Sequence, residues 1–163
     1  MKIKTLQAIV VEIKQGDGST AVTHGMLREL VKQDKINHFY RGNRLVSDMD
    51  KLVEEINKIF GIEDKNTMPR IRSINDAFLE LRESKPGLGI SEAGIRFLVK
   101  EKNIPSIEVR SRSFVALECF DEPYSNRFID INYCDKKKAL IDKIVQEQLA
   151  KGIESFNNRQ GGK

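Results

Sequence analysis

Basic and polar side chains gather in two short segments of this 163-residue chain, YRGNR at residues 40–44 and VRSRS at residues 109–113. Each segment lies between short runs that alternate apolar and polar residues, a pattern that predicts a β-hairpin with the basic residues at its tip. Guanidinium groups form paired hydrogen bonds with phosphate oxygens, so such a tip suits a nucleic-acid backbone or minor groove. The candidate contact residues at the two tips are Arg41, Asn43, Arg44, Arg110, Ser111 and Arg112.

The two predicted hairpins differ at their turns. Gly42 and Asn43 accept positive φ angles at little cost, so the first turn is expected to be tight. The second segment has no glycine at its tip and is interpreted as one residue longer, so a looser turn is expected there.

A second group of candidate residues lies at the start of two predicted helices, which begin at the hydroxyl residues Thr23 and Ser91. Hydroxyl residues are favoured N-caps, and the free N–H groups of a helix start suit phosphate. In a helix that enters the major groove, arginine can bind guanine and glutamate can accept from cytosine, with about 1–3 kcal/mol of discrimination per pair. The candidate residues of these two helices are Thr23, His24, Arg28, Ser91, Glu92 and Arg96.

Structural roles compete with base reading for several of these side chains. Arg28 and Arg96 can instead cover apolar surface with their aliphatic stems. Glu92 lies at the start of its helix, where the helix dipole favours any carboxylate. His24 and His38 have no carboxylate pattern between them, so a surface or half-buried histidine is favoured over a metal ligand.

Both groups of candidates lie within an internal repeat. At an offset of 68 residues, segment 3–36 aligns with segment 71–104 without a gap. Only 7 of the 34 pairs are identical, but apolar residues align with apolar residues and caps with caps, as in LRELVKQDKI (27–36) and IRFLVKEKNI (95–104). We therefore interpret the two segments as copies of one structural unit.

Each copy has the same predicted order of elements. Thr5 and Ser73 cap a first helix with an apolar stripe at i, i+3, i+4 and i+7, glycines end that helix, and a second helix and a hairpin follow. The first copy continues into a third helix, capped by Asp48 and with Phe60 on its inner side. The second copy has no such helix at the corresponding place.

A long amphipathic helix is predicted from about Asp135 to Asn157, with an apolar stripe wider than a coiled-coil seam. It can take the place of the third helix that the second copy lacks, which is the interpretation we favour. It can instead pair with another chain and form a homodimer. The stripe consists of Leu140, Ile141, Ile144, Val145, Leu149, Ile153 and Phe156.

A helix-turn-helix followed by a hairpin is a winged helix, and here the chain resembles a known family. The segments VTHGMLRELVKQDKINHFYRGNRLVSDMDKLVEEI (22–56) and ISEAGIRFLVKEKNIPSIEVRSRSFVAL (90–117) resemble the excisionase/MerR-type winged-helix DNA-binding family. The shared features are a hydroxyl cap, an LR.LVK-like helix, an Ile-Pro step into the first wing strand, and a basic wing. The chain departs from that pattern at Asn37, where the family favours proline, and at Arg110, where a wing glycine is usual.

The resemblance implies a mainly α fold with small β-hairpins, in the α+β class. We expect two tandem winged helix-turn-helix domains at residues 1–61 and 70–122, joined by a linker at 62–69 and followed by a C-terminal extension at 123–163. The two domains can bind two DNA half-sites in tandem through an extended linker. Alternatively, they can pack as a rigid pseudo-symmetric pair of which only one domain touches DNA.

For function, the resemblance implies a sequence-specific binder of double-stranded DNA from a mobile element or phage. Such a protein acts as an excisionase-like architectural factor in DNA recombination, beside an integrase or another protein partner. Alternatively, it acts in transcription regulation. A different class stays open: an adaptor that docks on a host enzyme, or a DNA-packaging subunit that oligomerises, each using winged helices as a scaffold.

The charge, the motifs and the cysteines of the chain bear on which of these functions are compatible with the sequence. A net charge of +4 and a pI near 9.0 favour a polyanionic partner only weakly. No nucleophile–base set, metal motif or cofactor motif is present, so we expect no enzyme, no metal and no cofactor. No apolar run approaches the roughly 18 residues of a membrane span, and Cys119 and Cys134 cannot form a disulfide framework. We therefore expect a cytoplasmic protein without membrane contact.

Overall fold

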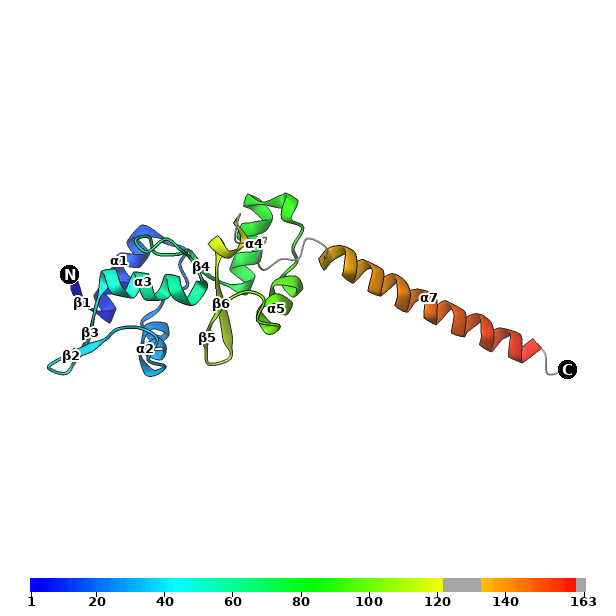
Figure 1. The fold of residues 1–163 in the computed structure, drawn as a ribbon, viewed down its shortest axis with the longest axis horizontal. Helices are drawn as coiled ribbons and strands as arrows, with labels where there is room; N and C mark the ends of the chain where they lie inside the picture. Colours follow the sequence, from blue (N-terminus) through cyan, green and yellow to red (C-terminus); the bar gives the residue numbers. More distant parts are fainter. Residues whose placement is uncertain (122–132, 161–163) are drawn as a thin grey trace. The chain divides into compact units, whose positions relative to one another are not determined.

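Two small three-stranded antiparallel sheets, each accompanied by helices, give this chain a mixed α and β fold (Figure 1). The structure is a computed structural model that describes residues 1–121 and 133–160, with side chains described for 1–121 and 140–154. The chain forms two units, Met1–Phe128 and Ile129–Lys163, and the first contains both copies of the repeat. Within the described residues, no helix is long and apolar enough to cross a membrane.

The first repeat, residues 3–60, begins its helices at the predicted caps. The Thr5 side chain accepts a hydrogen bond from the Ala8 N–H at 3.2 Å, and the Asp48 carboxylate accepts one from the Asp50 N–H at 3.3 Å. The apolar stripes of the helices face one another and are buried. The elements are β1 (Ile3–Thr5), α1 (Leu6–Gly16), α2 (His24–Lys32), β2 (Phe39–Arg41), β3 (Arg44–Asp48) and α3 (Met49–Phe60).

The second repeat, residues 71–120, follows the same order as far as its hairpin. Ser73 and Ser91 cap its two helices, accepting from the Asp76 and Gly94 N–H groups at 3.2 and 3.0 Å. These caps were predicted from the sequence and are confirmed. The elements are β4 (Ile71–Ser73), α4 (Ile74–Ser84), the 3-10 helix η1 (Pro86–Leu88), α5 (Glu92–Lys100), β5 (Ile107–Val109), β6 (Arg112–Ala116) and the 3-10 helix η2 (Leu117–Phe120).

The sheets show that the repeat extends further than the sequence alignment. The strand orders are β1-β3-β2 and β4-β6-β5, and in each sheet the strand before the first helix pairs with the second hairpin strand. Ile3 lies opposite Asp48 in the first sheet, and Ile71 lies opposite Ala116 in the second. The offset of 68 therefore continues without a gap through the hairpin to Ala116.

The expectation of a longer and looser second turn is wrong. Arg41 pairs with Arg44 across the first tip, and Val109 pairs with Arg112 across the second, so both turns contain two residues. Arg110 has a φ of 56°, which matches the φ of 61° at Gly42, the equivalent position. The arginine adopts the left-handed conformation that glycine adopts in the first repeat, although a side chain at such a φ costs roughly 1–2 kcal/mol.

The second repeat ends without a third helix in its described part. The 3-10 helix η2 takes that position, and Leu117, Cys119 and Phe120 are buried there. Burial raises the pKa of Cys119 to about 12, with a further contribution from the charge of Glu118, so the thiol stays protonated at neutral pH.

The predicted C-terminal helix is present as α7 (Tyr133–Gln160). The favoured expectation, that this helix takes the place of the helix missing from the second repeat, stays a prediction. Residues 140–154 are exposed throughout, and even Leu149 and Ile153 are 56% and 63% exposed. The side chain of Phe156 and the segment 122–132 lie outside the described part of the chain.

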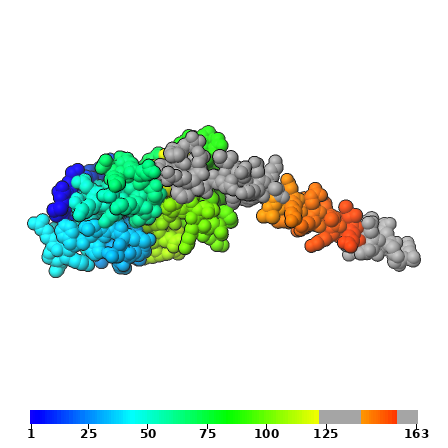
Figure 2. All heavy atoms as spheres, in the orientation of Figure 1, coloured from blue at the N-terminus to red at the C-terminus, as the bar shows by residue number. Residues whose placement is uncertain are grey.

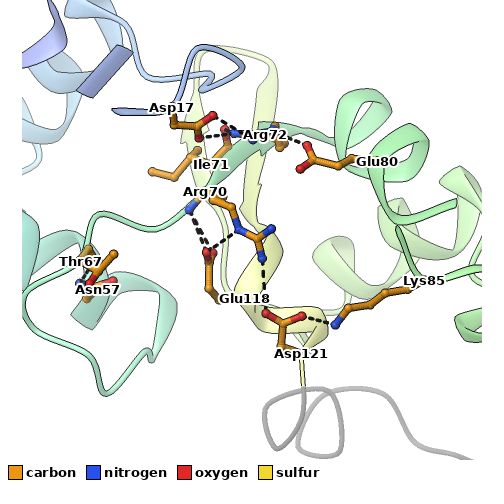
Figure 3. Close-up of polar contacts among 10 residues, drawn as sticks. All are labelled: Asp17, Asn57, Thr67, Arg70, Ile71, Arg72, Glu80, Lys85, Glu118 and Asp121. Carbon is orange, nitrogen blue, oxygen red and sulfur yellow. Dashed lines mark hydrogen bonds and ion pairs between the residues drawn. The ribbon is translucent and has the colours of Figure 1, made fainter. Parts of the chain in front are cut away.

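The two repeats pack directly on each other, and a buried arginine lies at the junction (Figure 3). The Arg72 guanidinium donates to both carboxylate oxygens of Asp17, at 2.6 and 3.1 Å, and to Glu80 at 2.7 Å. Burial alone would lower the pKa of Arg72, but the hydrogen bonds that it donates to the two carboxylates outweigh this effect, and the pKa is raised. Beside this cluster, the Ala21 N–H donates to the Ile71 carbonyl at 2.9 Å.

Further contacts hold the segment 62–69 between the repeats. The Asn57 side chain on α3 donates to the Thr67 carbonyl at 2.9 Å, and the Asp64 carboxylate accepts from the Asn66 N–H at 2.8 Å. The Cys119 thiol lies 3.7 Å from the Phe60 carbonyl, joining the end of one repeat to the end of the other. Of the two arrangements considered, these contacts favour a packed pair of repeats over an extended linker.

Candidate nucleic-acid interface

Helix α2 lies between the two hairpins, and all three elements extend toward the lower edge of Figure 1. Figure 2 shows the light-blue surface of α2 next to the yellow-green surface of the β5–β6 hairpin. Two hollows of the surface meet at this helix, one on the side of each hairpin. Since all of these elements belong to one compact unit, their side chains form a joint surface.

The first hollow lies between α2 and the β2–β3 hairpin and has a volume of about 450 Å³. His24 and Arg28 line it from the helix, and Tyr40, Asn43 and Arg44 line it from the hairpin. The sequence predicted four of these five residues as contacts.

The second hollow lies between α2 and the β5–β6 hairpin of the other repeat and has a volume of about 1090 Å³. The helix again contributes His24 and Arg28, here together with Thr23, Gly25, Glu29 and Lys32. The hairpin contributes Val109, Arg110, Ser111, Arg112 and Phe114. Because His24 and Arg28 line both hollows, the two form one continuous surface around the exposed side of α2.

Local structure explains why these side chains of α2 face outward. The Thr23 hydroxyl accepts from the Met26 N–H at 3.1 Å, which sets the start of the helix. Met26, Leu27 and Leu30 are then buried, so the helical period leaves Arg28 exposed and His24 half-buried on the opposite side. Thr23 therefore has a structural role as the cap of the helix, while the side chains of His24 and Arg28 remain available to a binding partner.

The arginines of this surface differ from Lys32 in their ion pairing. None of them has an ion-pair partner among the residues whose side chains the structure describes, whereas Lys32 pairs with Glu29 at 3.6 Å. Asp76, the other acidic residue in the second hollow, accepts a hydrogen bond from the Ser73 hydroxyl at 2.7 Å. Such unpaired guanidinium groups can bind an anion without breaking an existing contact. On this surface they are Arg28, Arg44, Arg110 and Arg112, and Arg41 lies beside it on β2.

The equivalent helix of the second repeat, α5, differs from α2 in the pairing of its charged side chains. Arg96 donates twice to Glu92, at 3.0 and 2.6 Å, one turn apart on α5. The equivalent pair in the first repeat is His24 and Arg28, where no carboxylate precedes the arginine. Neither hollow includes Ser91, Glu92 or Arg96, so the structure separates these three predicted residues from the surface around α2.

The residues of this surface that were not predicted from the sequence include Tyr40 and Lys32. Tyr40 is 71% exposed and stands next to the tip arginines, and Lys32 extends the basic side of α2. The signal for Tyr40 was an aromatic residue beside basic residues in FYRGNR, a combination that suits stacking on bases or sugars. Arg41 was predicted and is exposed, but lies on β2 outside both hollows.

No protein-family model, no curated protein and no solved structure matches this chain. The function must therefore be inferred from the residues and their arrangement.

Proposed function

We propose that this chain is a sequence-specific binder of double-stranded DNA, built from two tandem winged helix-turn-helix units. In this proposal α2 is the recognition helix and the β2–β3 hairpin is its wing. The observation that carries the proposal is the continuous surface of unpaired arginines around α2. The order strand, helix, helix, hairpin in each repeat supports it.

The chemistry of the surface suits a duplex. A helix is about 10–12 Å across, which matches the major groove at about 12 Å. With α2 in the groove, the exposed start of the helix faces base edges, where Arg28 would bind guanine through its two donors and His24 would contact a neighbouring base. The hairpin tip with Arg44 and Asn43 would then reach phosphate oxygens or the adjacent minor groove, next to Tyr40.

The resemblance to excisionase-type proteins suggests the biological role. We infer an architectural factor or transcriptional regulator of a mobile element or phage, acting beside an integrase or another protein. An adaptor that only docks on proteins would have no need for unpaired arginines on both sides of one helix. It would be recognised by a failure to prefer any DNA sequence.

The experiment uses a duplex selected from a randomised library with the full-length protein, and compares variants by fluorescence anisotropy. Arg28→Ala should weaken binding by about tenfold or more and relax the preference at one base pair, because a bidentate base contact contributes about 1–3 kcal/mol. Arg44→Ala should weaken binding to all sequences and reduce the salt slope by about one. Lys14→Ala, on an exposed position of α1 outside both hollows, is the matched control and should change neither. Equal behaviour of all three variants would overturn the proposal.

A further inference from the structure

We propose that the β5–β6 hairpin of the second repeat is a second wing on the DNA segment that α2 reads, so that the chain binds one continuous site instead of two half-sites. This inference rests on the proposed function and specifies its ligand geometry. It assigns unequal roles to the two repeats: the first supplies the reading helix and one wing, and the second supplies the other wing.

The position of the second wing beside α2 is fixed by a short series of contacts. The loop before α2 is bound to β4 by the Ala21–Ile71 hydrogen bond at 2.9 Å and by the Asp17–Arg72 ion pair at 2.6 Å. Strand β4 pairs in turn with β6, where Ser73 lies opposite Phe114. From there β6 runs two residues to the hairpin tip. The loop that leads into the reading helix and the second hairpin are thus anchored on the same strand.

Burial makes this connection stiff. The Arg72 side chain is only 4% exposed, and it donates three hydrogen bonds to carboxylates, two to Asp17 and one to Glu80. A buried charge that lost these partners would be strongly destabilising, so the junction resists opening. The relation of the second hairpin to α2 is therefore expected to persist in solution.

The second hairpin also carries an arginine where the backbone favours glycine. Arg110 has a φ of 56°, and the equivalent residue in the first repeat is Gly42. Strained backbone retained at an exposed tip is a pointer to function, because the fold would be more stable with glycine there. Arg110 and Arg112 line the hollow that also contains Arg28.

Helix α5, by contrast, presents an arginine that is paired with a carboxylate of its own helix. Its Arg96 is engaged by Glu92 at 2.6 Å, and neither residue lines the surface around α2. A second half-site read by α5 would require this pair to break. With α2 in a major groove, two wings on its opposite sides would contact the backbone on both flanks of that single groove.

The test is hydroxyl-radical footprinting of the full-length protein on the selected duplex, combined with salt-dependent anisotropy. We expect one continuous footprint, with protection on both sides of one major-groove contact. The double variant Arg110→Gly, Arg112→Ala should lose protection on one flank only and reduce the salt slope by about two. Arg41→Ala, Arg44→Ala should lose the other flank. Glycine at position 110 suits the left-handed backbone, so this variant is expected to fold.

The double variant Lys14→Ala, Lys51→Ala removes two exposed charges outside both hollows and is the matched control. The outcomes separate the two proposals. Wild-type protein with no sequence preference would overturn the proposed function. Specific binding with two separated footprints, or with a second-hairpin variant that behaves as the control does, would overturn the second wing and leave the proposed function standing.

Discussion

One difference between the repeats, His24 in the first and Glu92 in the second, determines whether the arginine one turn later has a carboxylate partner on its own helix. On α5 the carboxylate of Glu92 binds Arg96 in a pair four residues apart, the spacing at which helical side chains meet. On α2 the residue at that place is a histidine, and Arg28 has no carboxylate partner among the described residues. Two helices with the same fold thus present different charges to a partner.

His24→Glu should reproduce the α5 arrangement on α2 and weaken binding to the selected duplex by about tenfold. It places a carboxylate near base edges and phosphates, where like charges repel, and it gives Arg28 a competing partner. Fluorescence anisotropy measures the change. The reciprocal variant Glu92→His should leave the affinity within about twofold, because α5 lies outside the surface around α2. A large gain for Glu92→His would contradict the assignment of α2 as the only reading helix.

Arg110→Gly should raise the free energy of unfolding by about 0.5–1 kcal/mol while it weakens DNA binding. Glycine adopts the φ of 56° without the steric cost that a side chain meets there. The matched change in the first repeat, Gly42→Ala, should lower the free energy of unfolding by about 1 kcal/mol for the same reason. Urea denaturation followed by circular dichroism measures both. A loss of stability in Arg110→Gly would show that the arginine holds the turn.

At the scale of elements, strand β4 is the main determinant of how the second hairpin is held next to the loop before α2. It pairs with the second hairpin through β6, and it binds the loop before α2 through Ile71 and Arg72. The equivalent strand β1 has Lys4 at the position of Arg72, and Lys4 pairs with Glu12 of the same repeat. Among the described contacts, this position therefore links the two repeats through Arg72 and not through Lys4.

Asp17→Ala should lower the free energy of unfolding by about 1–3 kcal/mol, because it removes two of the hydrogen bonds of a buried guanidinium. Lys2→Ala breaks an exposed pair with Asp50 and should change the free energy of unfolding by less than about 1 kcal/mol. Thermal and urea unfolding test the contrast. If both variants were equally mild, the Asp17–Arg72 pair would not hold the repeats together.

The sequence predicted those elements that local chemistry determines. The hydroxyl caps at Thr5 and Ser91 were found because a helix start needs a side-chain acceptor, and the first hairpin because Gly42 marks its turn. The strands β1 and β4 were missed, since three residues are too few to show a period. The second tip was misjudged because Arg110 adopts a conformation that the residue type disfavours.

The arrangement of the candidate site could not be predicted from the sequence for a related reason. Thr23 and Arg110 were both predicted as contacts, but as members of separate domains. Their proximity depends on the junction at Arg72, which involves residues 55 positions apart in the chain. Pairing over such a distance leaves no periodic trace in a single sequence.

At the scale of the whole molecule, the chain combines a compact unit that holds both repeats with a long helix, α7. Along 140–154 this helix exposes apolar residues such as Ile144 and Leu149. Pairing of this stripe with a second copy stays a prediction. The arginine surface lies entirely within the first unit.

The central claim, that this chain is a sequence-specific DNA binder, is tested most directly by fluorescence anisotropy of the wild-type protein. The selected duplex is compared with a scrambled duplex of the same composition at two salt concentrations. We predict a preference of about 10³ or more, with the logarithm of the binding constant falling by several units per decade of salt. Equal and weak binding of the two duplexes at physiological salt would contradict the claim and would favour the alternative, in which the two repeats are a scaffold for protein partners.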